Sequence, residues 1–160
     1  MNDEIVRVYA DTSVFGGVFD EEFSVASQLF FEQVRSGELR LVVSEVIRKE
    51  IQGAPAKVKE LFDAMLVSAE VADVTSDALR LRQAYLNAGI LGPQWSDDAL
   101  HVALATITGC TMIVSWNFKH IVHYQKIPLY NTVNVRQGYN AIFIYSPLEV
   151  VGYGRNDEGL

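Results

Sequence analysis

The chain has 160 residues, a length that fits one domain able to bury most of its apolar surface. A hydrophobic content of 49% with 21% charged residues is typical of a globular protein and excludes wholesale disorder. The net charge of −7 excludes a protein that binds nucleic acid through a general excess of cations, so any such binding needs divalent ions or a local basic patch.

The first quarter of the chain has the pattern of a strand, a loop, a helix and a second strand. Residues 5–10 form a short apolar run rich in β-branched residues, which predicts a first strand. Residues 11–17 are expected to form a loop. Apolar residues recur at helical spacing over 24–36, where Gly37 ends the helix, and residues 39–43 are expected to form a second, buried strand.

The next segments predict two short helices, a third strand and a longer helix. Ser44 is suited to cap a helix that ends near Gly53, and Pro55 suits the first turn of a helix that reaches about residue 66. Residues 71–74 then predict a short strand, and residues 76–88 a helix.

The last third of the chain repeats this alternation. Ser96 is expected to cap a helix that reaches residue 108. Residues 112–114 are expected to form a fourth strand, which the polar turn 115–117 follows. The remaining expectations are a short helix through His120, a parallel strand near Leu129, and an edge strand over 141–145 that Pro147 ends.

Strands that alternate with helices predict an α/β protein with a parallel sheet covered on both faces. We expect one domain over residues 1–151 and a flexible tail over 152–160. The start of the chain is acidic and unlike a signal peptide, and no apolar run is long enough to span a membrane. Cys110 is the single cysteine, which favours a cytoplasmic setting and an inert thiol in the core.

Two acidic residues follow the first two strands, where functional groups of parallel sheets gather. Asp11 comes directly after the first strand, a place where an acid can also be a turn residue or a helix cap. Glu50 shares a helix face with Val46, Ile47 and Ile51, so it is expected to project toward the protein, where a carboxylate needs a partner or a metal. The alternative is that its side chain reaches a nearby edge and water.

Asp97 and Asp98 begin the helix after Ser96. The helix dipole favours negative charge there, which is by itself a sufficient structural reason for the pair. Asp98 shares its side of the helix with Val102 and Ala105, small residues suited to packing on a sheet, and is the better candidate to point inward.

Carboxylates brought together without a cation would repel, by roughly 4 kcal/mol for two charges 4 Å apart at an effective dielectric of 20. Hard oxygen ligands favour Mg²⁺ or Mn²⁺ over zinc, and Asn117, Thr12 and Ser13 supply further oxygens near the strand ends. His120 and His123 lack the additional ligands of a zinc site, so surface or supporting roles are expected for them. Four cations could form a local basic patch, or the solvated face of a helical hairpin: Arg48, Lys49, Lys57 and Lys59.

Four segments resemble, in order, the motifs of the PIN-domain family, in particular the VapC-type toxin ribonucleases of prokaryotic toxin–antitoxin pairs. They are residues 8–15 (Val-Tyr-Ala-Asp-Thr-Ser-Val-Phe), 44–51 (Ser-Glu-Val-Ile-Arg-Lys-Glu-Ile), 98–105 (Asp-Ala-Leu-His-Val-Ala-Leu-Ala) and 115–121 (Ser-Trp-Asn-Phe-Lys-His-Ile). The resemblance identifies Asp11, Glu50 and Asp98 as the motif acids. Asn117 stands where many members carry aspartate, which puts a second metal site in doubt.

The resemblance implies a three-layer α/β/α PIN-like fold with a mainly parallel sheet of four to five strands. It also implies a Mg²⁺- or Mn²⁺-dependent endoribonuclease in which Asp11, Glu50 and Asp98 are catalytic residues and metal ligands. Thr12, Ser13, Asp97 and Asn117 would support that site. The implied partners are an RNA substrate, a cognate antitoxin protein and a second copy of the chain.

Three alternative functions make different demands on the sequence. A haloacid-dehalogenase-type phosphatase needs an aspartate two positions after Asp11, where this chain has Ser13. A dinucleotide-binding enzyme needs three spaced glycines after the first strand, which Gly16 and Gly17 do not supply. The stronger alternative is a catalytically silent PIN-like module that binds RNA or a protein, which Asn117 and the acidic charge favour.

Overall fold

A computed structural model describes residues 5–152 as a five-stranded parallel sheet in the order β3-β2-β1-β4-β5. Its strands are β1 (Val6–Ala10), β2 (Leu39–Ser44), β3 (Glu70–Ala72), β4 (Met112–Val114) and β5 (Phe143–Tyr145). The β1 strand is central, and its last three residues are fully buried. Residues 153–160 of the expected flexible tail lie outside the described range.

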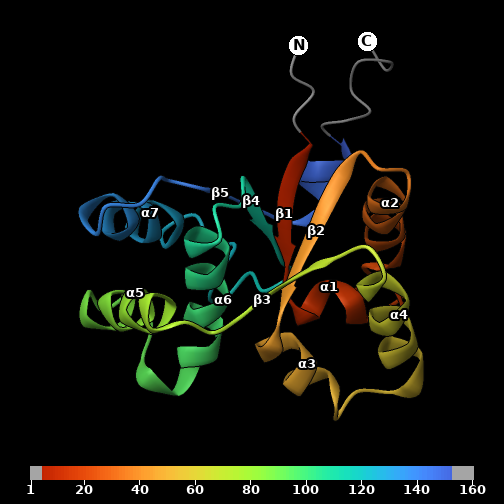
Figure 1. The fold of residues 1–160 in the computed structure, drawn as a ribbon, viewed down its shortest axis with the longest axis horizontal. Coiled ribbons are helices and arrows are strands. Elements are labelled where there is room, and N and C mark those ends of the chain that lie inside the picture. The colour runs from red at the N-terminus through yellow and green to blue at the C-terminus, as the bar shows by residue number, and fades with distance from the viewer. Residues whose placement is uncertain (1–4, 153–160) are drawn as a thin grey trace.

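Helices cover both faces of the sheet, which confirms the three-layer α/β/α architecture. The helices α1, α2 and α4 lie on one side and α5, α6 and α7 on the other (Figure 1). Their bounds are α1 (Thr12–Gly17), α2 (Ser24–Arg35), α3 (Glu45–Ile51), α4 (Ala56–Leu66), α5 (Ser76–Asn87), α6 (Ser96–Ile107) and α7 (Ile127–Arg136). Within residues 5–152, no helix has both the length and the apolar character that crossing a bilayer requires.

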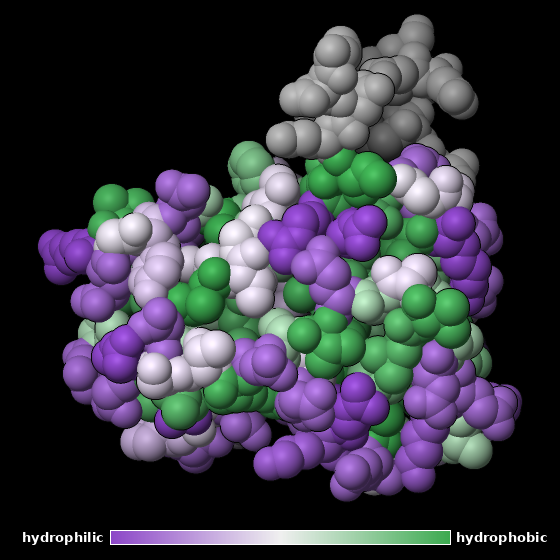
Figure 2. Space-filling model, viewed as in Figure 1, coloured by the Kyte–Doolittle hydropathy of each residue, from purple (hydrophilic) through white to green (hydrophobic). Residues whose placement is uncertain are grey.

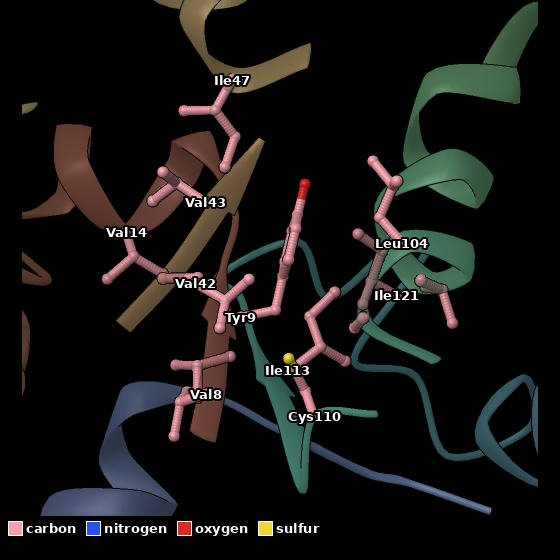
Figure 3. Packing of buried hydrophobic residues seen from close by; sticks show 14 of the residues in the cluster. Val8, Tyr9, Val14, Val42, Val43, Ile47, Leu104, Cys110, Ile113 and Ile121 are labelled. Carbon is pink, nitrogen blue, oxygen red and sulfur yellow. The ribbon is translucent and has the colours of Figure 1, made fainter. Parts of the chain in front are cut away.

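The carboxyl ends of β1 and β2 lie at one edge of the sheet, where α1 and α3 begin (Figure 1). The apolar core behind this edge includes Tyr9, whose side chain extends between Ile47 and Leu104 (Figure 3). The Tyr9 hydroxyl points away from Val8 and Cys110 in the same view. Cys110 is buried, as expected of a core thiol. The sheet edge is therefore backed by a rigid apolar layer with one polar group emerging from it.

The prediction of a loop over residues 11–17 was wrong, because this segment is helix α1. Asp11 is its N-cap, and its carboxylate accepts a hydrogen bond from the Ser13 backbone N–H at 3.1 Å. A capping acid directly after a strand favours helix formation, and this effect outweighs the two glycines at the end of α1.

The predictions for residues 118–136 were also wrong. The segment around His120 forms turns, and the expected strand near Leu129 is helix α7, which begins at Ile127 with Pro128 in its first turn. Proline at a helix start and the polar residues of this segment fit a helix better than a buried strand. The expected edge strand is confirmed as β5, which pairs with β4.

The helix caps differ from the predictions at three positions. Ser44 and Ser96 make no capping hydrogen bond through their side chains, and Ser96 is itself the first residue of α6, after a 3-10 turn over Pro93–Trp95. Pro55 precedes α4 as its N-cap. The Ser44 hydroxyl is hydrogen-bonded instead to the buried Tyr9 hydroxyl, so it joins β2 to β1 and does not cap α3.

An ion pair joins β1 to β3 across the intervening β2 and gives a pH-dependent prediction. Arg7 of β1 donates to Glu70 of β3 at 2.8 and 3.0 Å, and this hydrogen bond lowers the pKa of Glu70 below its ordinary value. A depressed carboxyl pKa contributes stability above the pKa of the unfolded chain, about 4.3, that is lost as the pH falls. Glu70→Gln should therefore lower the free energy of unfolding at pH 7 by about 0.5 kcal/mol, a value discounted for the exposed pair.

Urea unfolding at pH 7 and pH 3 measures this difference, with the exposed Glu60→Gln as the control. We expect Glu60→Gln to match the unchanged chain at both pH values. A deficit for Glu70→Gln that is equally large at pH 3 would contradict the assignment to the ion pair.

Candidate active site at the carboxyl ends of the strands

Asp11 is the most buried acid of the site, with 4% of the residue exposed. Its two carboxylate oxygens accept hydrogen bonds from the hydroxyls of Ser13 at 2.6 Å and Ser115 at 2.7 Å. Burial raises the pKa of Asp11, although the charge of His101 and the two hydroxyls oppose the shift. The carboxylate is thus precisely oriented but short of positive charge, which favours a cation beside it.

The loop after β4 holds this arrangement in place. The Trp116 backbone N–H donates to the Ser13 hydroxyl at 2.8 Å, and the Trp116 indole N–H donates to Ser27 at 2.8 Å. The indole packs against the end of α1 so closely that a Cβ atom built on Gly17 would lie 2.7 Å from the indole nitrogen. The glycine at the end of α1 therefore permits the contact that fixes the serine partners of Asp11.

Glu50 lies at the rim of the site, with 31% of its side chain exposed. It is more exposed than its aliphatic helix face predicted, because α3 is short and the side chain reaches an edge. The carboxylate accepts a hydrogen bond from the Thr12 hydroxyl and one from His101 Nε2 at 3.0 Å. Partial burial would raise the pKa of Glu50, but the hydrogen bond and charge of His101 and the Thr12 hydroxyl outweigh it and lower that pKa.

A series of side-chain hydrogen bonds connects Ser44 of β2, through Tyr9 of β1 and His101 of α6, to Glu50. The Tyr9 hydroxyl lies 2.7 Å from the Ser44 hydroxyl and 2.7 Å from Nδ1 of His101, whose Nε2 binds Glu50. Tyr9 and Ser44 are fully buried, and His101 is 2% exposed. Tyr9 and His101 each have a partner on both sides, so these hydrogen bonds fix the orientation of the imidazole that faces Glu50.

Removing the Tyr9 hydroxyl should show how much these buried hydrogen bonds contribute to stability. Tyr9→Phe leaves the hydroxyl of Ser44 and Nδ1 of His101 buried without their partner, which should lower the free energy of unfolding by about 1–3 kcal/mol. Denaturant unfolding measures the change, and Tyr124→Phe, at a tyrosine that is 80% exposed, is the matched control. Equal stability of the two variants would show that these hydrogen bonds contribute nothing.

Asp98 points inward, as its helix face predicted, and its side chain is 24% exposed. Its Oδ2 atom lies 2.8 Å from Nδ1 of His120, whose backbone N–H donates to the Asn117 side-chain oxygen at 2.9 Å. Asn117 thus supports Asp98 through His120. Asp97 is exposed at the start of α6 and lines a neighbouring pocket together with Glu50.

One buried histidine, His101, is acted on by the charges of all three acids. Burial would lower the pKa of His101, but the hydrogen bond that His101 donates to Glu50 and the negative charges of Asp11, Glu50 and Asp98 raise it. Three carboxylates far apart in the sequence therefore act on a single buried imidazole at the carboxyl end of the sheet.

The acids are not grouped as metal ligands in this conformation. Among the described residues, no three side chains of the kinds that bind metals are close enough to hold an ion. Asp11 is bound to serines, Glu50 to Thr12 and His101, and Asp98 to His120. Within residues 5–152 the acids Glu50 and Asp98 form ion pairs with histidine alone, and Asp11 forms none.

The donor set nevertheless fits a hard divalent cation in chemistry and charge. All three acids offer oxygen atoms, and the charge of the buried Asp11 carboxylate is unfavourable without a positive neighbour. A cation that binds here would replace hydrogen bonds that Glu50 and Asp98 now make to histidines. The fit therefore rests on the identity and burial of the donors.

Several residues of this site were not predicted. The resemblance pointed to the acids, but not to His101, Tyr9, Ser44 or Ser115 as their partners. His101 follows Asp98 by three positions and so lies on an adjacent part of the same helix face, which was the available signal. Tyr9 was expected to be an ordinary strand residue and Ser44 a helix cap, because nothing local to either position shows the pairing of β1 with β2.

Comparison with known proteins supports the fold. No family model matches the sequence, and no curated protein matches it. Among solved structures, the chain is similar to VapBC2 from Rickettsia felis bound to a DNA fragment from their promoter, with a TM-score of 0.56 and 13% identity. The match covers 88% of this chain and 98% of that chain. At this identity the likeness shows a shared fold, and the expected PIN-like fold is thereby confirmed.

Proposed function

We propose that the chain is a divalent-cation-dependent endoribonuclease of the VapC type, the toxin of a toxin–antitoxin pair, with Mg²⁺ or Mn²⁺ held by Asp11, Glu50 and Asp98. The observation that carries the proposal is that the charges of all three acids act on the buried His101, at the carboxyl ends of the strands, where parallel α/β folds place their active sites. The shared fold with VapBC2 supports the toxin class and a protein antitoxin as the partner.

The cation, when bound, would lower the pKa of a water molecule to make the nucleophile and would stabilise charge on the phosphate. The roles of the protein groups follow from their contacts. Ser13 and Ser115 hold the Asp11 carboxylate in one orientation. His101 orients Glu50, and His120, supported by Asn117, orients Asp98. Such supporting contacts commonly change metal affinity or activity by about 10- to 100-fold.

The test is RNA cleavage by the protein purified without an antitoxin. An RNA pool should be cut in the presence of Mn²⁺ and left intact in EDTA, and added Mn²⁺ should restore cutting after EDTA is removed. Products should carry a 5′-phosphate and a 3′-hydroxyl. RNA that is bound but uncut under all conditions would instead support the catalytically silent PIN-like module.

A further inference from the structure

A pocket of about 330 Å³ opens beside Glu50, between helices α3, α5 and α6. Its volume lies at the lower end of small-ligand pockets, which span roughly 300–1,000 Å³. Glu50 forms part of its wall, so the pocket adjoins the proposed cleavage centre. Hydrophilic and apolar residues alternate over this part of the surface, where α3 and α5 face the viewer (Figure 2).

Arg82 gives the pocket a cation without an acidic partner. Its Nε atom is buried and has no hydrogen-bond partner among the described residues. Arg80, two positions earlier on α5, is paired with Asp77, whereas Arg82 forms no ion pair within the described range. A buried guanidinium donor without an acceptor is unfavourable, and an anionic ligand would supply the acceptor. Lys49 provides a second cation in the same wall.

The other walls restrict the anion that can bind. The pocket also contains Glu45, which is engaged by Arg48 at 3.1 Å, and the exposed Asp97. Together with Glu50, these acids disfavour a doubly charged free phosphate more than a phosphodiester, which carries one negative charge. Between these two phosphate ligands, the lining therefore favours the phosphodiester.

An apolar surface lies in the same pocket. Val74 and Leu79 are each 38% exposed, and both line it. Unpaired bases of single-stranded RNA stack on aromatic side chains or arginine planes while cations hold the backbone, and in this pocket Val74 and Leu79 offer an aliphatic surface in place of the aromatic one. The pocket combines both kinds of surface next to Glu50.

We propose that this pocket binds the nucleotide adjacent to the cleaved bond of a single-stranded RNA, with its phosphodiester on Arg82 and Lys49 and its base on Leu79 and Val74. The assignment rests on the proposed function, because Glu50 belongs both to the pocket and to the proposed cation site. It adds a substrate-binding surface to that function and predicts that unpaired RNA is preferred over duplex.

The test separates binding from cleavage. Fluorescence anisotropy measures the Kd of a short labelled single-stranded RNA for the Asp11→Asn chain in EDTA, over a range of salt concentrations. Adding Arg82→Gln should raise the Kd about 10-fold and reduce the salt slope by roughly 0.7, the value for one lost phosphate contact. Adding Arg80→Gln, on the same helix but outside the pocket, should change neither.

The apolar surface is tested in the same assay. Leu79→Ala should raise the Kd about threefold or more without changing the salt slope, because it removes packing and no charge. Val67→Ala, at a residue that is 89% exposed on a different helix end, should have no effect. Thermal melting of each variant confirms that it is folded.

The outcomes distinguish the pocket from the catalytic proposal. Equal effects of Arg82→Gln and Arg80→Gln, or no RNA binding at all, would overturn the pocket even if the unchanged protein cuts RNA. Binding that depends on Arg82, in a protein that cuts no RNA with Mn²⁺, would support the pocket and overturn the nuclease.

Discussion

Asp11→Asn should reduce RNA cleavage about 1,000-fold, because loss of the cation's stabilisation of the transition state is worth several kcal/mol. The substitution keeps the size of the side chain, so Ser13 and Ser115 retain a polar neighbour. The charge is removed, and one acceptor oxygen becomes an amide donor, so one of the two serine hydroxyls has to reorient.

The same substitution should leave the metal-free fold at least as stable. Burial raises the pKa of Asp11, which means that its charge is unfavourable at neutral pH in the absence of a cation. We therefore expect a melting temperature in EDTA equal to or above that of the unchanged chain. Asp63→Asn, at an exposed position on α4, is the control and should keep full cleavage. Cleavage by Asp11→Asn at the unchanged rate would show that Asp11 is not needed for cleavage, or that the activity comes from a contaminating nuclease.

The two neighbouring glycines of α1 should respond to alanine in opposite directions. A Cβ atom at Gly17 would lie 2.6 Å from the Ser27 hydroxyl and 2.7 Å from the Trp116 indole nitrogen, so Trp116 has to move. Overpacking of this kind should lower the free energy of unfolding by about 2 kcal/mol. A Cβ atom at Gly16 meets nothing within 4 Å, and alanine there should raise stability by about 0.5 kcal/mol.

Gly17→Ala should also weaken catalysis more than its stability loss alone explains. Trp116 donates its backbone N–H to Ser13, which in turn donates to Asp11. Displacing the indole therefore disturbs the support of the buried acid. Urea unfolding and RNA cleavage of both variants, measured well below the melting temperature, test this. Equal stability of the two alanine variants would contradict the close packing of Trp116 on α1.

The strand and helix pattern of the first hundred residues was predictable because it is carried by local signals. Apolar β-branched runs marked β1 and β2, and Gly37 marked the end of α2 with its positive φ of 86°. The loop expected over residues 11–17 failed since two glycines concealed the effect of Asp11 as a cap. The strand expected near Leu129 failed because a short apolar segment does not distinguish a strand from a helix.

The three acids were predicted from the position of Asp11 after β1, from the helix faces of Glu50 and Asp98 and from the motif resemblance, whereas their partners were not predicted. The contact between Glu50 and His101 joins α3 to α6, and that between Asp98 and His120 joins α6 to the loop after β4. Such pairs depend on how the layers pack, which no local pattern records. For the same reason the exposure of Glu50 was underestimated from its helix face alone.

Binding of Mn²⁺ to the RNA-free protein, followed by calorimetric titration, tests the central claim most directly. The claim predicts saturable binding by the unchanged chain and by Glu60→Gln, with binding weakened about 10-fold or more in Glu50→Gln. Equal Mn²⁺ affinity in all three proteins, or no binding at millimolar Mn²⁺ by folded protein, would contradict a cation site formed by Asp11, Glu50 and Asp98.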